Sequence, residues 1–269
     1  MTILNRLGAH TGSYEPYTLE EALAGISAAG YRYVELAAIH GFVEHVPLNA
    51  DAATINRILR MLNSFDLIPT SLSSHSDLTT VEGLSHGRQG IDLCHRLGIA
   101  VMNTAVGGPV NEDEDENAFL SHIDAFADYA AERNVVIGIE IHGKITGTAH
   151  KTRHLIEAIA RDNVRINYDT SNSEYFSGVV VYDDLPDAFP YVVHCHLKDY
   201  VGGIGVWDFP AVGAGHIDFG RVLALFKDNE FQGAFSVEIE FQGQPWPSLE
   251  MVNQAMLESR AHLKGLGLT

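Results

Sequence analysis

The stretch Tyr191-Val-Val-His-Cys-His-Leu-Lys-Asp-Tyr200 is the one around which the predicted architecture is organised. Its β-branched start and its alternation indicate a strand, in which side chains two residues apart share a face. His194, His196 and Lys198 then point to one side, and the residues between them to the other. Two imidazoles and an ammonium are costly to bury unless they are paired or bind a ligand. A solvated face on an edge strand is the alternative.

Seven further segments have strand-like patterns, and segments with helical patterns lie between them and after the last strand. The expected strands are residues 3–10, 31–38, 69–75, 99–106, 135–142, 164–172, 192–199 and 234–241. The expected helices are residues 18–29, 51–66, 82–97, 111–133, 149–161, 182–189, 218–229 and 247–264.

This alternation predicts an α/β fold with a parallel sheet, and eight units in 269 residues predict a closed (β/α)8 TIM barrel. A doubly wound open sheet is the alternative, but the Gly-rich phosphate turn that usually follows its first strand is not visible. No linker interrupts the pattern, so we expect a single domain over residues 1–269.

The composition limits the classes of partner. With 17 basic and 35 acidic residues, the formal net charge is −18. An acidic surface repels phosphate backbones and anionic lipids, which argues against nucleic-acid and membrane partners. The two cysteines, Cys94 and Cys195, do not suggest a disulfide framework, and no signal peptide or run of 18 apolar residues is visible. We therefore expect a cytoplasmic protein.

Four residues near the ends of consecutive predicted strands carry ligand atoms: Glu140, Asp169, His196 and Glu238. Active sites of TIM barrels lie at these strand ends. The three carboxylates would repel one another unless a cation lies between them, and together with the imidazole they form a donor set that suits Mn²⁺, Mg²⁺ or Co²⁺. Glu238 and Glu240 share a face, so spacing alone leaves open which of them is the ligand.

Four motifs resemble those of the xylose isomerase-like barrel superfamily, and more narrowly of the sugar phosphate isomerase/epimerase group, which includes ketose 3-epimerases and inosose dehydratases. They are Ile139-Glu-Ile-His-Gly143, Asn167-Tyr-Asp-Thr170, His194-Cys-His-Leu-Lys-Asp199 and Ser236-Val-Glu-Ile-Glu240. The resemblance covers nearly the whole chain, and the second half carries the specific motifs.

The resemblance implies that Glu140, Asp169, His196 and Glu238 bind one divalent ion, with Mn²⁺ as first choice and Mg²⁺, Co²⁺ or Zn²⁺ as alternatives. It also implies isomerisation or epimerisation through a metal-stabilised enediolate, with Glu140 and Glu238 exchanging the proton. Lys198 would lie near substrate oxygens. A lyase or dehydratase that expels a leaving group from the same enediolate is the alternative.

Other residues are weaker candidates for the site. His142 shares a face with Glu140 and is a candidate substrate ligand or proton carrier. The remaining candidates for lining a sugar pocket are Glu35, His75, Asn103 and Trp207. A structural role, in hydrogen bonding or in packing, explains each of these residues as well as contact with a sugar does.

The substrate that we expect is a small unphosphorylated ketose, keto sugar or cyclitol, because Lys198 has few basic neighbours near the strand ends. Oligomers are common in the family, so a homo-oligomer is an expectation from the resemblance alone.

The superfamily also contains apurinic endonucleases with three zinc ions. Those enzymes have a histidine where this chain has Asn172, and an Asp-x-His pair where this chain has Trp207-Asp-Phe209. These departures and the acidic charge argue against a nuclease. A non-catalytic metal-binding barrel is the remaining alternative, and the retention of four ligand types together argues against it.

Overall fold

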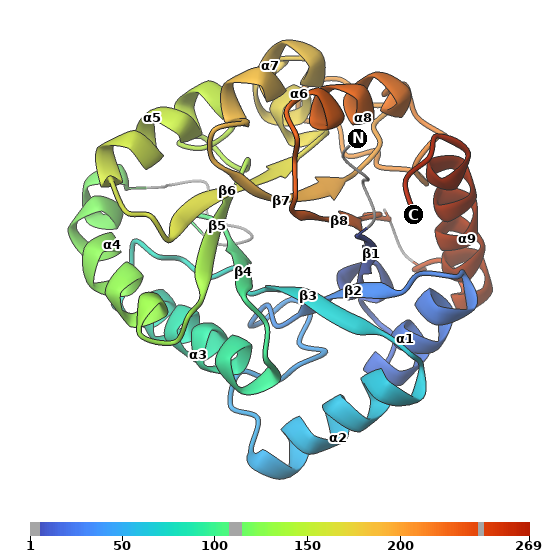
Figure 1. The fold of residues 1–269 in the computed structure, drawn as a ribbon, viewed down its shortest axis with the longest axis horizontal. Helices are drawn as coiled ribbons and strands as arrows, with labels where there is room; N and C mark the ends of the chain where they lie inside the picture. Colours follow the sequence, from blue (N-terminus) through green and yellow to red (C-terminus); the bar gives the residue numbers. More distant parts are fainter. Residues whose placement is uncertain (1–5, 108–114, 242–244) are drawn as a thin grey trace.

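Eight parallel strands close into a barrel in sequential order, and helices surround it (Figure 1). The computed structural model describes residues 6–107, 115–241 and 245–269. The predicted (β/α)8 fold and its single domain are confirmed. The strands are β1 Leu7–His10, β2 Tyr33–Ala37, β3 Ile68–Ser73, β4 Val101–Thr104, β5 Val136–Glu140, β6 Val164–Asp169, β7 Val192–Leu197 and β8 Ala234–Val237.

The helices are α1 Leu19–Ala28, α2 Ala52–Ser64, α3 Val81–Leu97, α4 Glu116–Ala131, α5 Ala149–Ile159, α6 Asn172–Ser177, α7 Val181–Ala188, α8 Phe219–Asp228 and α9 Leu249–Gly265, with a 3-10 turn, η1, at Thr11–Tyr14. Local signals explain many of their ends. Thr18 and Glu21 form a capping box at the start of α1. Gly98 ends α3 with φ 72°, a left-handed conformation that suits glycine.

Every strand except the first ends before the expected residue, and the sixth and eighth strands differ most from the sequence-based expectation. The sixth strand stops at Asp169 instead of Asn172, because the Asp169 carboxylate accepts hydrogen bonds from the backbone N–H groups of Ser171 and Asn172 and turns the chain into α6. The eighth strand stops at Val237 instead of Phe241. The predicted beginning of the first strand and residues 111–114 of the acidic run lie outside the described residues.

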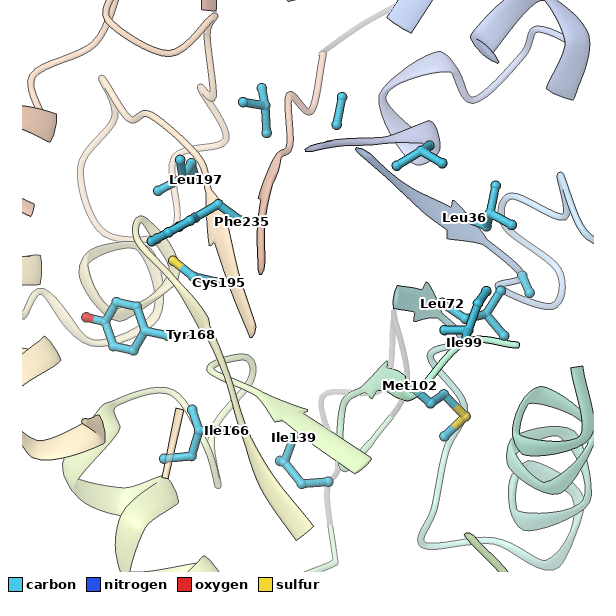
Figure 2. Close-up of a cluster of buried hydrophobic side chains, with 14 of the residues drawn as sticks. Leu36, Leu72, Ile99, Met102, Ile139, Ile166, Tyr168, Cys195, Leu197 and Phe235 are labelled. Atoms are coloured by element: carbon cyan, nitrogen blue, oxygen red, sulfur yellow. The ribbon is translucent and has the colours of Figure 1, made fainter. Parts of the chain in front are cut away.

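The strand alternation separates two layers. Apolar side chains of one parity fill the space between strands and helices, and Figure 2 shows members of this layer, including Tyr168, Cys195 and Leu197. Side chains of the other parity fill the barrel interior, where His194 and His196 are buried. The β7 strand is therefore part of a closed barrel and is not an exposed edge. Across the described ranges, no helix combines the length and the apolar composition that crossing a membrane requires.

Candidate metal and sugar site

The four predicted metal ligands come together at the C-terminal end of the barrel. Glu140 and Asp169 end β5 and β6, His196 lies near the end of β7, and Glu238 directly follows β8. One ligand atom from each residue lies within 4.8 Å of the others, and all four residues are buried. Parallel pairing of Asp169 with His196 sets two of them at the same level of the sheet.

The geometry of the cluster fits a divalent cation. His196 Nδ1 lies 3.3 Å from Glu140 Oε2 and 3.3 Å from Glu238 Oε2, so two carboxylates converge on one nitrogen of the imidazole. Asp169 Oδ2 and Glu238 Oε2 are buried and have no hydrogen-bond donor. Buried carboxylate oxygens without donors are costly, and a bound cation would satisfy them. With three oxygens and one nitrogen, the set suits Mn²⁺, Mg²⁺, Co²⁺ or Zn²⁺.

The cluster shifts the pKa values of its members. Burial raises the pKa of Asp169 to about 7, against the attraction of the Lys198 ammonium. Burial alone would also raise the pKa values of Glu140 and Glu238, but their contacts with His196 hold both values well below the usual range. These carboxylates in turn raise the pKa of His196 in spite of its burial. Opposite charges at short range therefore outweigh desolvation for three of the four residues.

Lys198 is the cation beside the cluster. Its Nζ lies 3.7 Å from Asp169 Oδ2, 3.6 Å from Glu238 Oε2 and 2.6 Å from Glu240 Oε2. The ammonium also lies 4.3 Å from the centre of the Phe209 ring, which is within cation–π range. Burial lowers the pKa of Lys198, but the three acidic neighbours raise it well above the usual value, so the side chain stays protonated.

A cavity of about 190 Å³ opens above the cluster. Its lining includes Glu140, Glu238 and Lys198, whereas Asp169 and His196 are not part of the lining. Of the predicted substrate-binding residues, His75, His142 and Trp207 line this cavity.

His75 and His142 occupy one side of the cavity with different partners. His75 Nε2 lies 3.1 Å from Glu140 Oε2, and this contact raises the pKa of His75 although burial opposes it. His142 packs edge-on against Phe176, and its Nδ1 has no hydrogen-bond partner. Burial lowers the pKa of His142 to about 4, so its ring is neutral and free to bond to a ligand hydroxyl.

Glu35 and Asn103 are displaced from the cavity that they were expected to line. Both are fully buried inside the barrel. Asn103 Nδ2 donates to Glu35 Oε1 at 2.6 Å, and Glu35 Oε2 lies 2.9 Å from His196 Nε2. Glu35 therefore contacts the His196 ring from inside the barrel, and Asn103 contacts Glu35.

Sequence reasoning missed several residues at the cavity. The expected sixth strand runs to Asn172 and leaves no room for the helix α6 that begins there. Asn172, Tyr175 and Phe176 of this helix line the cavity. Asn172 Nδ2 also donates to Glu140 Oε1 at 3.2 Å. The polar run that follows Asp169 was the available signal, since Asp, Ser, Thr and Asn favour turns and helix starts.

His10, at the end of β1, is a further residue of the cavity lining. Its Nδ1 accepts a hydrogen bond from the Gly12 backbone N–H at 3.0 Å, whereas its buried Nε2 has no partner. Burial lowers the pKa of His10, so the neutral ring carries its proton on Nε2. Two further clusters of residues that could ligate a metal are His10 with His196 and Glu238, and Glu35 with His194 and His196. Within the described ranges, every cluster of this kind therefore includes His196.

The sequence is similar to those of a known protein family and of a characterised epimerase. The profile of the xylose isomerase-like TIM barrel family matches residues 23–264. The L-ribulose 3-epimerase of Methylomonas sp. (strain DH-1) is 23% identical over 247 residues, which are 85% of this chain and 80% of that protein.

Two solved structures illustrate the likeness in fold. A D-psicose 3-epimerase crystallised in the presence of D-fructose superposes with a TM-score of 0.79 at 14% identity, over 98% of this chain and 100% of that one. A xylose isomerase-like TIM barrel protein from Mycobacterium smegmatis in complex with magnesium superposes with a TM-score of 0.76 at 16% identity, over 98% of this chain and 96% of that one.

Proposed function

This chain belongs to the xylose isomerase-like TIM barrel family, and we propose that it is a divalent-metal-dependent enzyme that isomerises or epimerises an unphosphorylated sugar. The buried cluster of Glu140, Asp169, His196 and Glu238 at the cavity floor carries the proposal. The similarity to an L-ribulose 3-epimerase supports epimerisation of a ketose. Mn²⁺ is the proposed ion, and the magnesium in a structural neighbour supports a hard divalent cation.

A divalent ion held by these four residues would stabilise the negative charge that develops on the substrate oxygens when a proton leaves the carbon next to the carbonyl. The Glu140 and Glu238 carboxylates each place an oxygen 3.3 Å from His196 Nδ1. Both have lowered pKa values, so each is ionised and can accept a proton. One carboxylate would remove the proton and the other would return one to the carbon.

Three other groups can hold the substrate in place. The Lys198 ammonium can donate hydrogen bonds to a carbonyl or hydroxyl oxygen. The neutral His142 ring and the unpartnered Nε2 of His10 can each bond to a hydroxyl group. Aromatic side chains on the cavity wall, including Phe176 and Trp207, offer apolar faces for the C–H side of a sugar ring.

The charge of the cavity supports an unphosphorylated substrate. Lys198 is the only lysine or arginine among the described residues that line the cavity, and it is paired with Glu240. Phosphate binding usually relies on several cationic groups or on free backbone N–H groups. A phosphorylated sugar would therefore leave its charge poorly compensated beside the carboxylates that line the cavity, Glu15, Glu140, Glu238 and Glu240.

Solvent deuterium exchange tests the proposal. The purified protein, supplied with Mn²⁺ in deuterated water, is incubated with a panel of ketoses, keto sugars and inososes. We expect deuterium at a carbon next to the carbonyl, together with an isomeric or epimeric product, and loss of both in Glu140→Gln. Deuterium exchange followed by loss of water would identify the alternative lyase or dehydratase, in which His142 or Lys198 would serve as the acid. No exchange with any substrate, with Mn²⁺, Mg²⁺ or Co²⁺, would contradict the proposal.

A further inference from the structure

Glu35 contacts the metal ligand His196 on the side of the ring that faces away from the other ligands. Glu35 Oε2 lies 2.9 Å from His196 Nε2, whereas the carboxylates of Glu140 and Glu238 face Nδ1. An ionised carboxylate can only accept hydrogen bonds, so Nε2 must carry a proton in this contact. When the ring gives up its other proton to bind an ion, the lone pair is therefore on Nδ1, which is the nitrogen that faces Glu140 and Glu238.

Glu35 is itself held in place by Asn103. Asn103 Nδ2 donates to Glu35 Oε1 at 2.6 Å, so the two carboxylate oxygens have separate partners. The Asn103 amide is in turn confined by the adjacent strand, because a Cβ on Gly138 would lie 2.5 Å from Asn103 Oδ1. Glycine at position 138 therefore leaves the space that this amide occupies.

A second chain of hydrogen bonds in the same layer reaches Glu140. His194 Nε2 lies 3.0 Å from Ser71 Oγ and 3.1 Å from Ser236 Oγ, and its Nδ1 lies 2.9 Å from Asn167 Oδ1. Asn167 Nδ2 then donates to Glu140 Oε2 at 3.0 Å. The buried polar layer beneath the cavity thus contacts two of the four candidate ligands from below.

We infer that Glu35 is a positioning residue for the metal: it keeps the His196 proton on Nε2 and presents Nδ1 to the ion. This inference rests on the proposed metal site. Carboxylates that accept from the second nitrogen of a ligating histidine fix its tautomer and its orientation, and their loss typically weakens metal binding by about 10–100-fold. Glu35 does not line the cavity, so its effect passes through His196.

Two variants test this role. In Glu35→Gln, the Asn103 NH₂ group should keep the amide oxygen of the new side chain as its acceptor. The NH₂ group of the glutamine then faces the N–H of His196 Nε2, and two donors oppose each other. Glu35→Met removes the acceptor whichever way the Asn103 amide is oriented. Asp184→Asn is the matched control, because it also converts a buried carboxylate to its amide. The Asp184 carboxylate accepts hydrogen bonds from Ala149 N–H and Tyr168 OH and is not a member of the ligand cluster.

The first readout is the affinity for Mn²⁺, measured by electron paramagnetic resonance on metal-depleted protein. We expect Glu35→Gln and Glu35→Met to bind about 10–100-fold more weakly than wild type, and Asp184→Asn to bind as wild type does. Wild-type affinity in both Glu35 variants would overturn the inference about Glu35 and leave the proposed metal site in place. A wild type that binds no Mn²⁺ would overturn the proposed metal site, and the inference with it.

The second readout does not depend on the Glu35 variants. Nitrogen-15 labelled histidine in metal-depleted wild type should give a downfield Nε2–H resonance that exchanges slowly with water and disappears in His196→Asn. A His196 Nε2 without a bound proton, or one that exchanges freely, would overturn the inference even if the Glu35 variants were unstable.

Discussion

Lys198 Nζ lies 2.6 Å from Glu240 Oε2 and 3.6 Å from Glu238 Oε2, so the two glutamates that follow β8 have different partners. Glu240 forms the closer ion pair with the ammonium. Glu238 places an oxygen among those of the ligand cluster instead. This difference lets one pair of matched variants test the proposed metal site.

The first prediction concerns bound metal. Glu238→Gln, Asp169→Asn and His196→Ala should each lose the divalent ion, since each removes a ligand or its charge. Glu240→Gln should keep it. Elemental analysis of the purified proteins checks this expectation. Stoichiometric metal in Asp169→Asn and His196→Ala, or its loss in Glu240→Gln, would show that the ion is held elsewhere.

The second prediction concerns the pH dependence of metal binding. Metal ligands must be deprotonated. Since the pKa of Asp169 is raised to about 7 and that of His196 is also raised, both groups compete for protons near neutral pH. Mn²⁺ should therefore bind more weakly at pH 6 than at pH 8, by about tenfold per pH unit for each proton released.

Calorimetry in buffers with different ionisation enthalpies counts the protons that leave on binding. We expect at least one proton to be released at pH 6. Binding that releases no protons and has the same affinity at both pH values would contradict the shifted pKa values.

The third prediction concerns Lys198. Lys198→Met keeps much of the apolar stem but removes the ammonium that is placed to contact substrate oxygens. At saturating Mn²⁺ we expect kcat/KM to fall by about 10²-fold or more, within the range for loss of a hydrogen-bond donor to a developing oxyanion. Glu240→Gln, which keeps the ammonium, should reduce kcat/KM less. Wild-type turnover by Lys198→Met would remove this residue from the mechanism.

The fourth prediction concerns stability away from the site. Asp184 accepts from the Ala149 N–H at the start of α5 and from Tyr168 OH, and burial raises its pKa from 3.8 to about 6. A carboxyl group with a raised pKa favours the folded state at low pH, and this contribution is lost as the pH rises from about 4 to 6. Between these values, ionisation should cost about 3 kcal/mol of folding free energy.

Asp184→Asn cannot ionise, so its unfolding free energy relative to that of wild type should increase from pH 4 to pH 7. Chemical denaturation of both proteins at the two pH values measures this difference. A difference that stays constant with pH would show that Asp184 titrates with an ordinary pKa.

Much of the fold could be predicted because its signals are local. Alternating side chains in the strands, helix starts such as Thr18 with Glu21, and a terminator such as Gly98 depend on near neighbours in the chain. The end of β6 was less predictable. Asp169 is compatible with a continued strand, and its hydrogen bonds to Ser171 and Asn172 N–H, which begin α6, become visible only in the folded chain.

The sequence by itself determined the barrel and the set of ligand types at its strand ends, because periodicity and strand order place Glu140, Asp169 and His196 at one end of the sheet. Only the tertiary structure decided that Glu238, and not Glu240, lies in the cluster, and that Glu35 lies behind His196 and away from the cavity. Spacing along a strand fixes which face a side chain occupies. Its depth and its partners depend on side chains that distant strands bring to the same point.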